Sequence, residues 1–308
     1  MVDIKQPREV GYGSRAPQPA GSSVGQHTVP GATPDRPKSA TNLPRVDFDA
    51  PPVVETFLGV QFQPVPGLTL THFGLFWGTM RNQYPTQEVK PPLPPVVEEF
   101  VSPPQPRAVG IQLTAEPDAR CWFVDETSTQ LIQVQRDRFI RNWRKGAPPN
   151  DRYPRYDDLR PKFEHDWQSF LNFLRNERLD APEVNQCEVT YINHIELGRG
   201  WQALGELHKI TPIVSEGQRR FLPSPELHSL NVSYVMPDNL GRLHVSAQPA
   251  IRRQDAKVGI QLTLTARGKP VSSEISDIIA WFNLGHDWIV HGFVDMTTRE
   301  MRNIWEQR

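Results

Sequence analysis

The chain has 308 residues, with 34 lysine plus arginine residues against 35 aspartate plus glutamate residues and a net charge of -1. This balance excludes a generally basic nucleic-acid coat and an acidic solvating tail. No apolar run reaches the roughly 18 residues of a membrane helix, and two cysteines are too few for a disulfide framework. We therefore expect a soluble, cytoplasmic protein that makes no membrane contact.

Proline is unusually frequent, with 31 residues concentrated in two segments. Residues 1–52 hold nine prolines and five glycines without apolar periodicity. Such a composition cannot bury enough surface to offset the entropy of ordering, which predicts a disordered arm. Residues 85–106 hold eight more prolines. We interpret them as a stiff surface connection, and the alternative is a polyproline II ligand for an aromatic groove.

Apolar periodicity predicts regular elements from Val53 onward. In the first half these are a strand over Val53–Phe62, a helix marked by Phe73, Phe76, Trp77, Met80 and Tyr84, strands over Cys121–Asp125 and Leu131–Lys145, and a long helix marked by Leu159, Phe163, Trp167, Phe170, Leu171 and Leu174. Asp157 and Asp158 complement the dipole at the start of the long helix, and Pro161 requires that helix to begin close to it.

The pattern then restarts in the second half. It predicts a strand over Cys187–Ile195, a short helix over Trp201–Lys209, strands over Leu230–Val235, Arg242–Gln248 and Val258–Ala266, and a long helix marked by Ile275, Ile278, Ile279, Phe282, Ile289 and Phe293. Thr297 and Glu300 have the spacing of a capping box for a last short helix.

The two halves, residues 53–180 and 181–308, share the order strand, helix, strands, long helix. We interpret this as a twofold repeat of architecture, packed as one compact unit. The predicted fold class is α+β, with antiparallel sheet or sheets covered by long helices. Whether the halves share one sheet stays open at this point.

The strongest candidate site is the segment Leu131–Lys145, where Arg136 and Asp137 predict a tight turn between two strands. Five cations and one anion lie between Arg136 and Lys145, although the chain as a whole is neutral. The candidate binding residues are Gln133, Gln135, Arg136, Arg138, Arg141, Asn142, Trp143, Arg144 and Lys145.

A two-residue loop pairs Gln135 with Arg138 and so predicts which hairpin residues share a face. One face carries Gln133, Gln135, Arg138 and Asn142, and the other carries Ile132, Val134, Phe139, Arg141 and Trp143. Cross-strand neighbours lie about 5 Å apart, so amides and a guanidinium converge. Guanidinium groups bind carboxylates and phosphates, and Trp143 can stack on a base. The alternative is that these polar residues have no binding role and only form the solvent-exposed face of the hairpin.

Catalytic and metal-binding patterns are weak. His194 and Glu196 share a predicted strand face, but two ligands do not make a metal site. The sequence has no Gly-x-Ser-x-Gly elbow and no phosphate loop, and both cysteines have the surroundings of small buried hydrophobes. We therefore predict no catalytic residue, no metal and no cofactor.

Several motifs carry a resemblance to a known family. They are Val134–Lys145, Tyr153–Tyr156, Glu188–His194, Pro51–Glu55, Leu75–Trp77 and the region Leu284–Trp305. On these residues the chain resembles a sporadically distributed family of uncharacterised bacterial proteins with a VQRDRFIRNWRK-type hairpin. The resemblance covers residues 50–308. Its patchy occurrence implies an accessory role, in phage defence or as an antitoxin-like partner.

We expect a non-catalytic interaction protein that contacts a partner protein or an anionic ligand through the 131–145 hairpin. One alternative is nucleic-acid binding through the same arginines and Trp143. Another is a small-molecule pocket under the C-terminal helix, which is suggested by the two apolar stripes of that helix. The sequence predicts neither the identity of the partner nor an oligomeric state.

Overall fold

The computed structural model describes residues 46–100, 119–148, 152–217 and 220–308. Nine strands in these ranges form one antiparallel sheet in the order β2-β3-β4-β5-β1-β6-β9-β8-β7. The strands are β1 (Val53–Phe62), β2 (Thr86–Lys90), β3 (Arg120–Val124), β4 (Gln130–Gln135), β5 (Arg138–Arg144), β6 (Val184–Glu196), β7 (Leu230–Val235), β8 (Arg242–Arg252) and β9 (Lys257–Gly268). The two halves of the chain share this sheet because β1 pairs with β6 at its centre.

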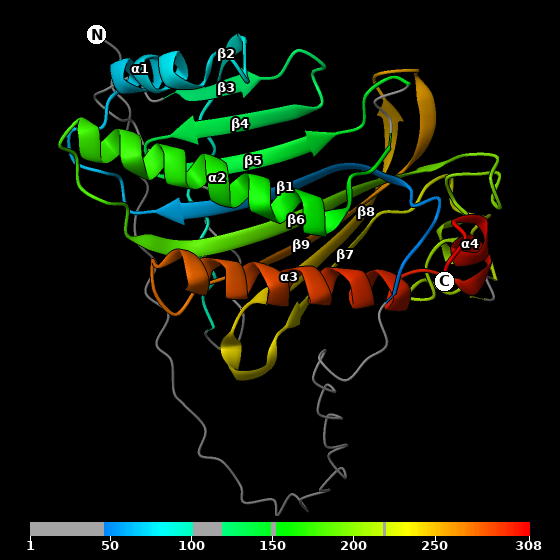
Figure 1. The fold of residues 1–308 in the computed structure, drawn as a ribbon. Helices are drawn as coiled ribbons and strands as arrows, with labels where there is room; N and C mark the ends of the chain where they lie inside the picture. Colours follow the sequence, from blue (N-terminus) through cyan, green and yellow to red (C-terminus); the bar gives the residue numbers. More distant parts are fainter. Residues whose placement is uncertain (1–45, 101–118, 149–151, 218–219) are drawn as a thin grey trace, which may run out of the picture. The chain divides into compact units, whose positions relative to one another are not determined.

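Four α-helices within the same described ranges accompany the sheet, which makes the fold class α+β. They are α1 (Leu70–Met80), α2 (Arg155–Asn176), α3 (Ile275–Asp295) and α4 (Arg299–Ile304). Figure 1 shows α2 and α3 crossing the same face of the sheet. No helix in the described ranges combines the length and the apolarity that crossing a bilayer requires.

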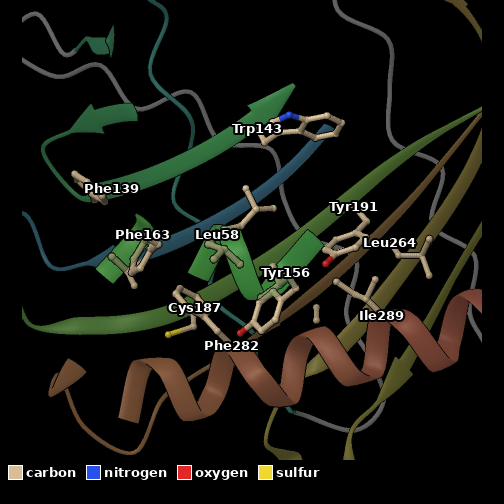
Figure 2. Close-up of a cluster of buried hydrophobic side chains, with 14 of the residues drawn as sticks. Leu58, Phe139, Trp143, Tyr156, Phe163, Cys187, Tyr191, Leu264, Phe282 and Ile289 are labelled. Carbon is tan, nitrogen blue, oxygen red and sulfur yellow. The ribbon is translucent and has the colours of Figure 1, made fainter. Parts of the chain in front are cut away.

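An aromatic core fills the space between the sheet and the two long helices (Figure 2). The ring of Phe139 on β5 lies 5.9 Å from Phe163 and 5.4 Å from Phe170, both on α2. Phe163 in turn lies 4.9 Å from Phe282 on α3. Burial of each such side chain contributes about 1.5–3 kcal/mol, so this layer is a major source of stability.

Close packing of α3 on the sheet depends on Gly285. A Cβ at this position would lie 3.3 Å from both Ala266 on β9 and Val189 on β6. The absence of a side chain therefore lets the helix backbone approach the centre of the sheet.

Several predicted elements differ from the structure. The short helix predicted over Trp201–Lys209 is wrong, because only Leu207–Lys209 form a 3-10 turn. Trp201 and Leu207 are both buried, so their apolar spacing reflects a loop that packs into the core. The strand Thr86–Lys90 is missing from the prediction because prolines flank it on both sides.

Two helix signals also need correction. Helix α2 begins at Arg155, so Pro161 lies well inside it and cannot donate the backbone hydrogen bond that a helix expects there. The cap of α4 is Thr298, whose hydroxyl accepts from the Met301 amide, and not Thr297. Thr297 instead donates its hydroxyl to the backbone oxygen of Phe293.

The predicted disordered arm falls mostly on residues 1–45, which lie outside the described residues. Its last part, residues 46–52, is ordered. Phe48 is buried, with its ring 5.4 Å from that of Phe293. The backbone around Phe48 bonds to the C-terminal segment, including the Asp49 amide to the Glu306 oxygen at 3.1 Å. This aromatic anchor explains why the end of the predicted arm folds.

Candidate functional site

The 131–145 hairpin has the register that its two-residue turn predicts. The pairs are Gln135 with Arg138, Gln133 with Ile140, and Leu131 with Asn142. Gln133, Gln135, Arg138 and Asn142 therefore share the face of the sheet that points away from α2 and α3. We call this surface the open face. Its neighbours on the other strands are polar as well, including Gln61, Gln186 and Arg267.

Two of the predicted binding residues lie on the opposite, helix-covered face. Arg141 is buried, and its Nε donates to Asp166 Oδ2 on α2 at 2.8 Å. Trp143 is 2% exposed and packs against Tyr153, with ring centroids 5.4 Å apart. Both residues hold the core together and do not line the open face.

Gln133, Gln135, Arg138, Asn142 and Arg144 lie on the open face. Gln133 connects several of them, since its side-chain oxygen accepts from Arg120 at 2.9 Å and from the Trp122 indole at 3.0 Å. Its amide group donates to Asn142 at 2.7 Å, and Asn142 donates to Glu55 at 2.7 Å. This chain of bonds crosses β3, β4, β5 and β1 and fixes the side chains in place. Arg136 and Lys145 are half-buried at the two ends of the hairpin.

A cluster of cations surrounds Trp122 on the open face. Lys90 Nζ lies 4.8 Å from the indole centroid, and the guanidinium carbons of Arg120 and Arg144 lie 5.5 and 5.4 Å from it. We call these four residues the cation–indole cluster. Burial, and the charge of Arg138, lower the pKa of Arg120. Of these four residues, only Arg144 is among the binding residues predicted from the sequence. The strand predicted over Cys121–Asp125 places Trp122 on the face opposite to Cys121 and Phe123, and this alternation is the sequence signal that could have indicated it.

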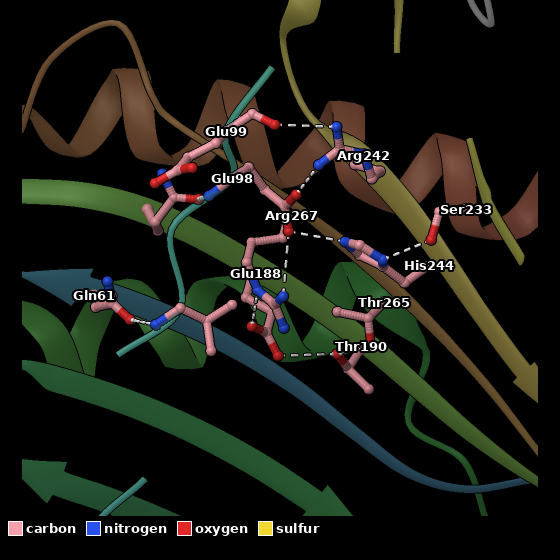
Figure 3. Close-up of polar contacts among 12 residues, drawn as sticks. Gln61, Glu98, Glu99, Glu188, Thr190, Ser233, Arg242, His244, Thr265 and Arg267 are labelled. Atoms are coloured by element: carbon pink, nitrogen blue, oxygen red, sulfur yellow. Dashed lines mark hydrogen bonds and ion pairs between the residues drawn. The ribbon is translucent and has the colours of Figure 1, made fainter. Parts of the chain in front are cut away.

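The second polar region of the open face holds residues 91–100, which we call the strap. Gln135 accepts from the Leu93 amide at 2.9 Å and donates to the Leu93 oxygen at 2.8 Å. The Val96 amide donates to Gln61 at 2.8 Å. The backbone of the strap is therefore held by glutamine side chains of the sheet. Figure 3 shows the contact of Gln61.

Glu98 anchors the strap through its carboxylate, which is 1% exposed. It pairs with Arg242, with His244 at 2.8 Å, and with Arg267 at 3.3 Å. Figure 3 shows these three side chains converging from β8 and β9. Burial raises the pKa of Glu98, but hydrogen bonds and charges from these groups outweigh it and hold the pKa at about 2. We call the side chains of Arg242, His244 and Arg267 the carboxylate clamp.

A pocket of about 480 Å³ lies on the other side of the sheet, between α3 and the start of α2. Tyr153 donates its hydroxyl to Tyr191 at 2.8 Å, and Tyr191 lies 3.0 Å from His286 Nδ1. Tyr156 stacks on His286 with ring centroids 4.0 Å apart. Burial raises the pKa of Tyr153 and Tyr191 well above that of free tyrosine, so both hydroxyls stay neutral.

Comparisons with models of protein families, with curated proteins and with solved structures found no match. Within the described residues, no group of three or more His, Cys, Asp or Glu side chains is placed to hold a metal ion. The fold and the site together define an α+β protein whose nine-stranded antiparallel sheet carries a polar open face.

Proposed function

We propose that the protein is a non-catalytic interaction protein that binds an acidic segment of a partner protein at the cation–indole cluster. The observation that carries this proposal is the gathering of three cations around the single indole of Trp122. The cluster is continuous with the hairpin through the bond from Arg120 to Gln133.

The charge balance of the cluster favours an anionic ligand. Lys90 pairs with Glu88 at 2.6 Å. Among the described residues, Arg120 has no ion pair, and the carboxylate nearest to Arg144 across the strands is Glu55, whose pKa is raised by burial and lowered in part by the Arg144 charge. Like charges held close together repel, and a carboxylate placed between them relieves that repulsion while it accepts hydrogen bonds from the guanidinium groups.

The alternative of nucleic-acid binding has less support. Trp143, the ring expected to stack on a base, is buried against Tyr153 on the helix-covered face. A nucleic acid would therefore have to use Trp122 and the cation–indole cluster, so the two ligands would compete for the same residues.

A binding assay with two probes tests the proposal. We expect a labelled oligoglutamate to bind the full chain at low salt, and the double variant Arg120→Gln, Arg144→Gln to lower the affinity about tenfold, since each exposed ion pair contributes up to about 1 kcal/mol. A matched control changes two exposed arginines of other elements, Arg81→Gln and Arg175→Gln, and should bind like the wild type.

Single-stranded DNA is the second probe in this assay. Tighter binding of DNA than of oligoglutamate, with a steep salt dependence, would favour the nucleic-acid alternative. Absence of binding by both probes at low salt would contradict the proposal. The accessory role implied by the family resemblance is tested separately, by comparing phage plating on cells with the wild-type chain and with the double variant.

A second candidate function is small-molecule binding in the pocket beneath α3. Its support is a volume of about 480 Å³, within the usual range for ligand sites, and a wall of neutral hydrogen-bonded tyrosines. Native mass spectrometry of the purified protein should then show a retained small molecule. Val290→Trp at the pocket wall should release that molecule, whereas Val271→Trp at an exposed site should not. An unliganded mass for the wild type would contradict this function.

We further propose that the two halves form a twofold repeat with β1 and β6 as equivalent central strands. The sheet order supports this, because β5, β4 and β3 follow outward from β1, as β9, β8 and β7 follow outward from β6. In each half a long helix, α2 or α3, follows the strands and lies on the same face of the sheet, and only the second half continues into a further helix, α4.

A further inference from the structure

We propose that the groove beneath the strap is a binding site for an extended, proline-rich peptide with an acidic side chain, and that residues 91–100 occupy it as an exchangeable internal ligand. A partner segment would lay its backbone on the glutamines and its carboxylate in the clamp. This site uses residues other than the cation–indole cluster, so it extends beyond the function proposed above.

The glutamines of the groove recognise the backbone of the strap. Gln135 makes two bonds to one residue, Leu93, and Gln61 bonds to the Val96 amide. Gln186 accepts from the Glu98 amide at 3.2 Å. Hydrogen bonds to the backbone tolerate many different side chains on the bound segment. Extended peptides are commonly bound through such backbone contacts. Prolines suit the positions between these bonds because they need no hydrogen-bond partner for a backbone N–H.

The clamp supplies the selectivity for an acid. Two guanidinium groups and one imidazole converge on the Glu98 carboxylate, a geometry that no neutral side chain can satisfy equally well. Arg267 is held in position from its other side by Glu188 at 2.6 Å. His244 is likewise held from the sheet, 2.9 Å from the Ser233 hydroxyl. These two side chains are therefore positioned by the sheet, whereas Arg242 contacts the strap through Glu98, the Glu99 oxygen and the Phe100 ring.

Few apolar contacts hold the strap in the groove. Its prolines are exposed, Val97 is 43% exposed, and residues 91–100 belong to no strand. A cavity of about 50 Å³ remains between Leu93, Val96 and the sheet. The strap therefore fills its own groove incompletely, and a peptide with larger side chains at those two positions has room to fit better.

The test uses a labelled peptide of the strap sequence, residues 91–100, and fluorescence anisotropy. The full chain carrying Glu98→Gln has a weakened internal anchor, so we expect it to bind the peptide at least tenfold more tightly than the wild type. A peptide with Glu98→Gln should lose at least tenfold in affinity. A peptide with Glu99→Gln is the matched control, because Glu99 is exposed and only its backbone oxygen bonds to the sheet.

Two further variants locate the binding. Adding Arg242→Gln to the Glu98→Gln chain should abolish peptide binding, whereas adding Arg120→Gln and Arg144→Gln should leave it unchanged. If only the chain with Arg120→Gln and Arg144→Gln lost binding, the peptide would be assigned to the cation–indole cluster, and the proposal that it binds in the groove would be overturned. Equal binding of the Glu98→Gln and Glu99→Gln peptides would overturn the clamp.

Hydrogen exchange of the wild-type chain provides a test that needs no substitution. If the strap is exchangeable, the amides of Leu93, Val96 and Glu98 open locally and exchange much faster than the paired amides of β1 and β6. Exchange of all of them at one common slow rate would show that the strap leaves only on global unfolding, which would overturn the proposal even if the Glu98→Gln chain failed to fold.

Discussion

Replacement of Asp166 by asparagine should strongly destabilise the protein. Asp166 Oδ2 accepts from Arg141 Nε and from the Tyr84 hydroxyl, both at 2.8 Å. The side chains of Arg141 and Asp166 are 5% and 3% exposed. Removal of one partner from a buried ion pair leaves an uncompensated buried charge, which typically costs about 3–5 kcal/mol. At about 2–4 °C per kcal/mol for a domain of this size, the melting temperature should fall by roughly 10 °C.

Urea unfolding followed by tryptophan fluorescence measures this loss. Glu164→Gln is the matched control, because it removes one charge from the half-exposed pair between Arg160 and Glu164 on the same helix. That pair should contribute less than about 0.5 kcal/mol. The double variant Arg141→Met, Asp166→Leu should be more stable than Asp166→Asn, since it leaves no charge without a partner.

The result also bears on the role of Arg141. An Asp166→Asn chain within about 1 kcal/mol of the wild type would refute the assignment of Arg141 to a buried ion pair that stabilises the fold. So would a double variant less stable than Asp166→Asn alone.

Three further predictions concern other parts of the chain. The pKa of Glu98 is about 2 in the folded chain against 4.5 for an ordinary glutamate, so its stabilising contribution is complete above pH 4.5 and is lost as the pH falls toward 2. The difference in unfolding free energy between wild type and Glu98→Gln should shrink over that range, and a constant difference in urea titrations would contradict this. Gly78→Ala at an exposed position of helix α1, where a Cβ meets no atom within 4 Å, should add about 1 kcal/mol of stability. By contrast, Gly268→Ala, whose Cβ would lie 2.2 Å from the Leu240 oxygen, should remove about 1–3 kcal/mol. If urea unfolding showed that both substitutions raise, or both lower, the free energy of unfolding, this reasoning would be excluded. Burial raises the pKa of the Cys187 thiol, so a thiol reagent should modify it only at the rate of unfolding, and rapid modification of the native chain would disprove its burial.

The hairpin could be predicted from the sequence because its geometry is local. A two-residue turn fixes which side chains face each other, so the register from Leu131 to Asn142 follows from the position of Arg136 and Asp137. The same register places Gln133 and Trp143 on opposite faces of the sheet. What the hairpin alone does not show is which of the two faces the helices cover, and for that reason Arg141 and Trp143 were included among the binding residues.

The strap and its clamp could not be predicted in this way. Glu98 and Arg242 are 144 residues apart in sequence, and their contact depends on the order of strands in the whole sheet. The proline-rich composition around Glu98 indicates an extended chain but gives no direction in space. Arg242 and Arg267 lie in alternating strands, where a charged residue is expected on any solvated face.

The pairing of β1 with β6 at the centre of the sheet has a consequence for the speed of folding. The β4–β5 and β8–β9 pairs join neighbours in the chain, and such local contacts form early because little loop entropy is lost. Leu58 pairs with Val189, far along the sequence, so the central pair closes a large loop. Non-local contacts of this kind slow folding. Contacts that form before the rate-limiting step act on the folding rate, so we expect substitutions in the β4–β5 and β8–β9 hairpins to reduce it, and substitutions at contacts made only after the central pair closes to act mainly on the rate of unfolding.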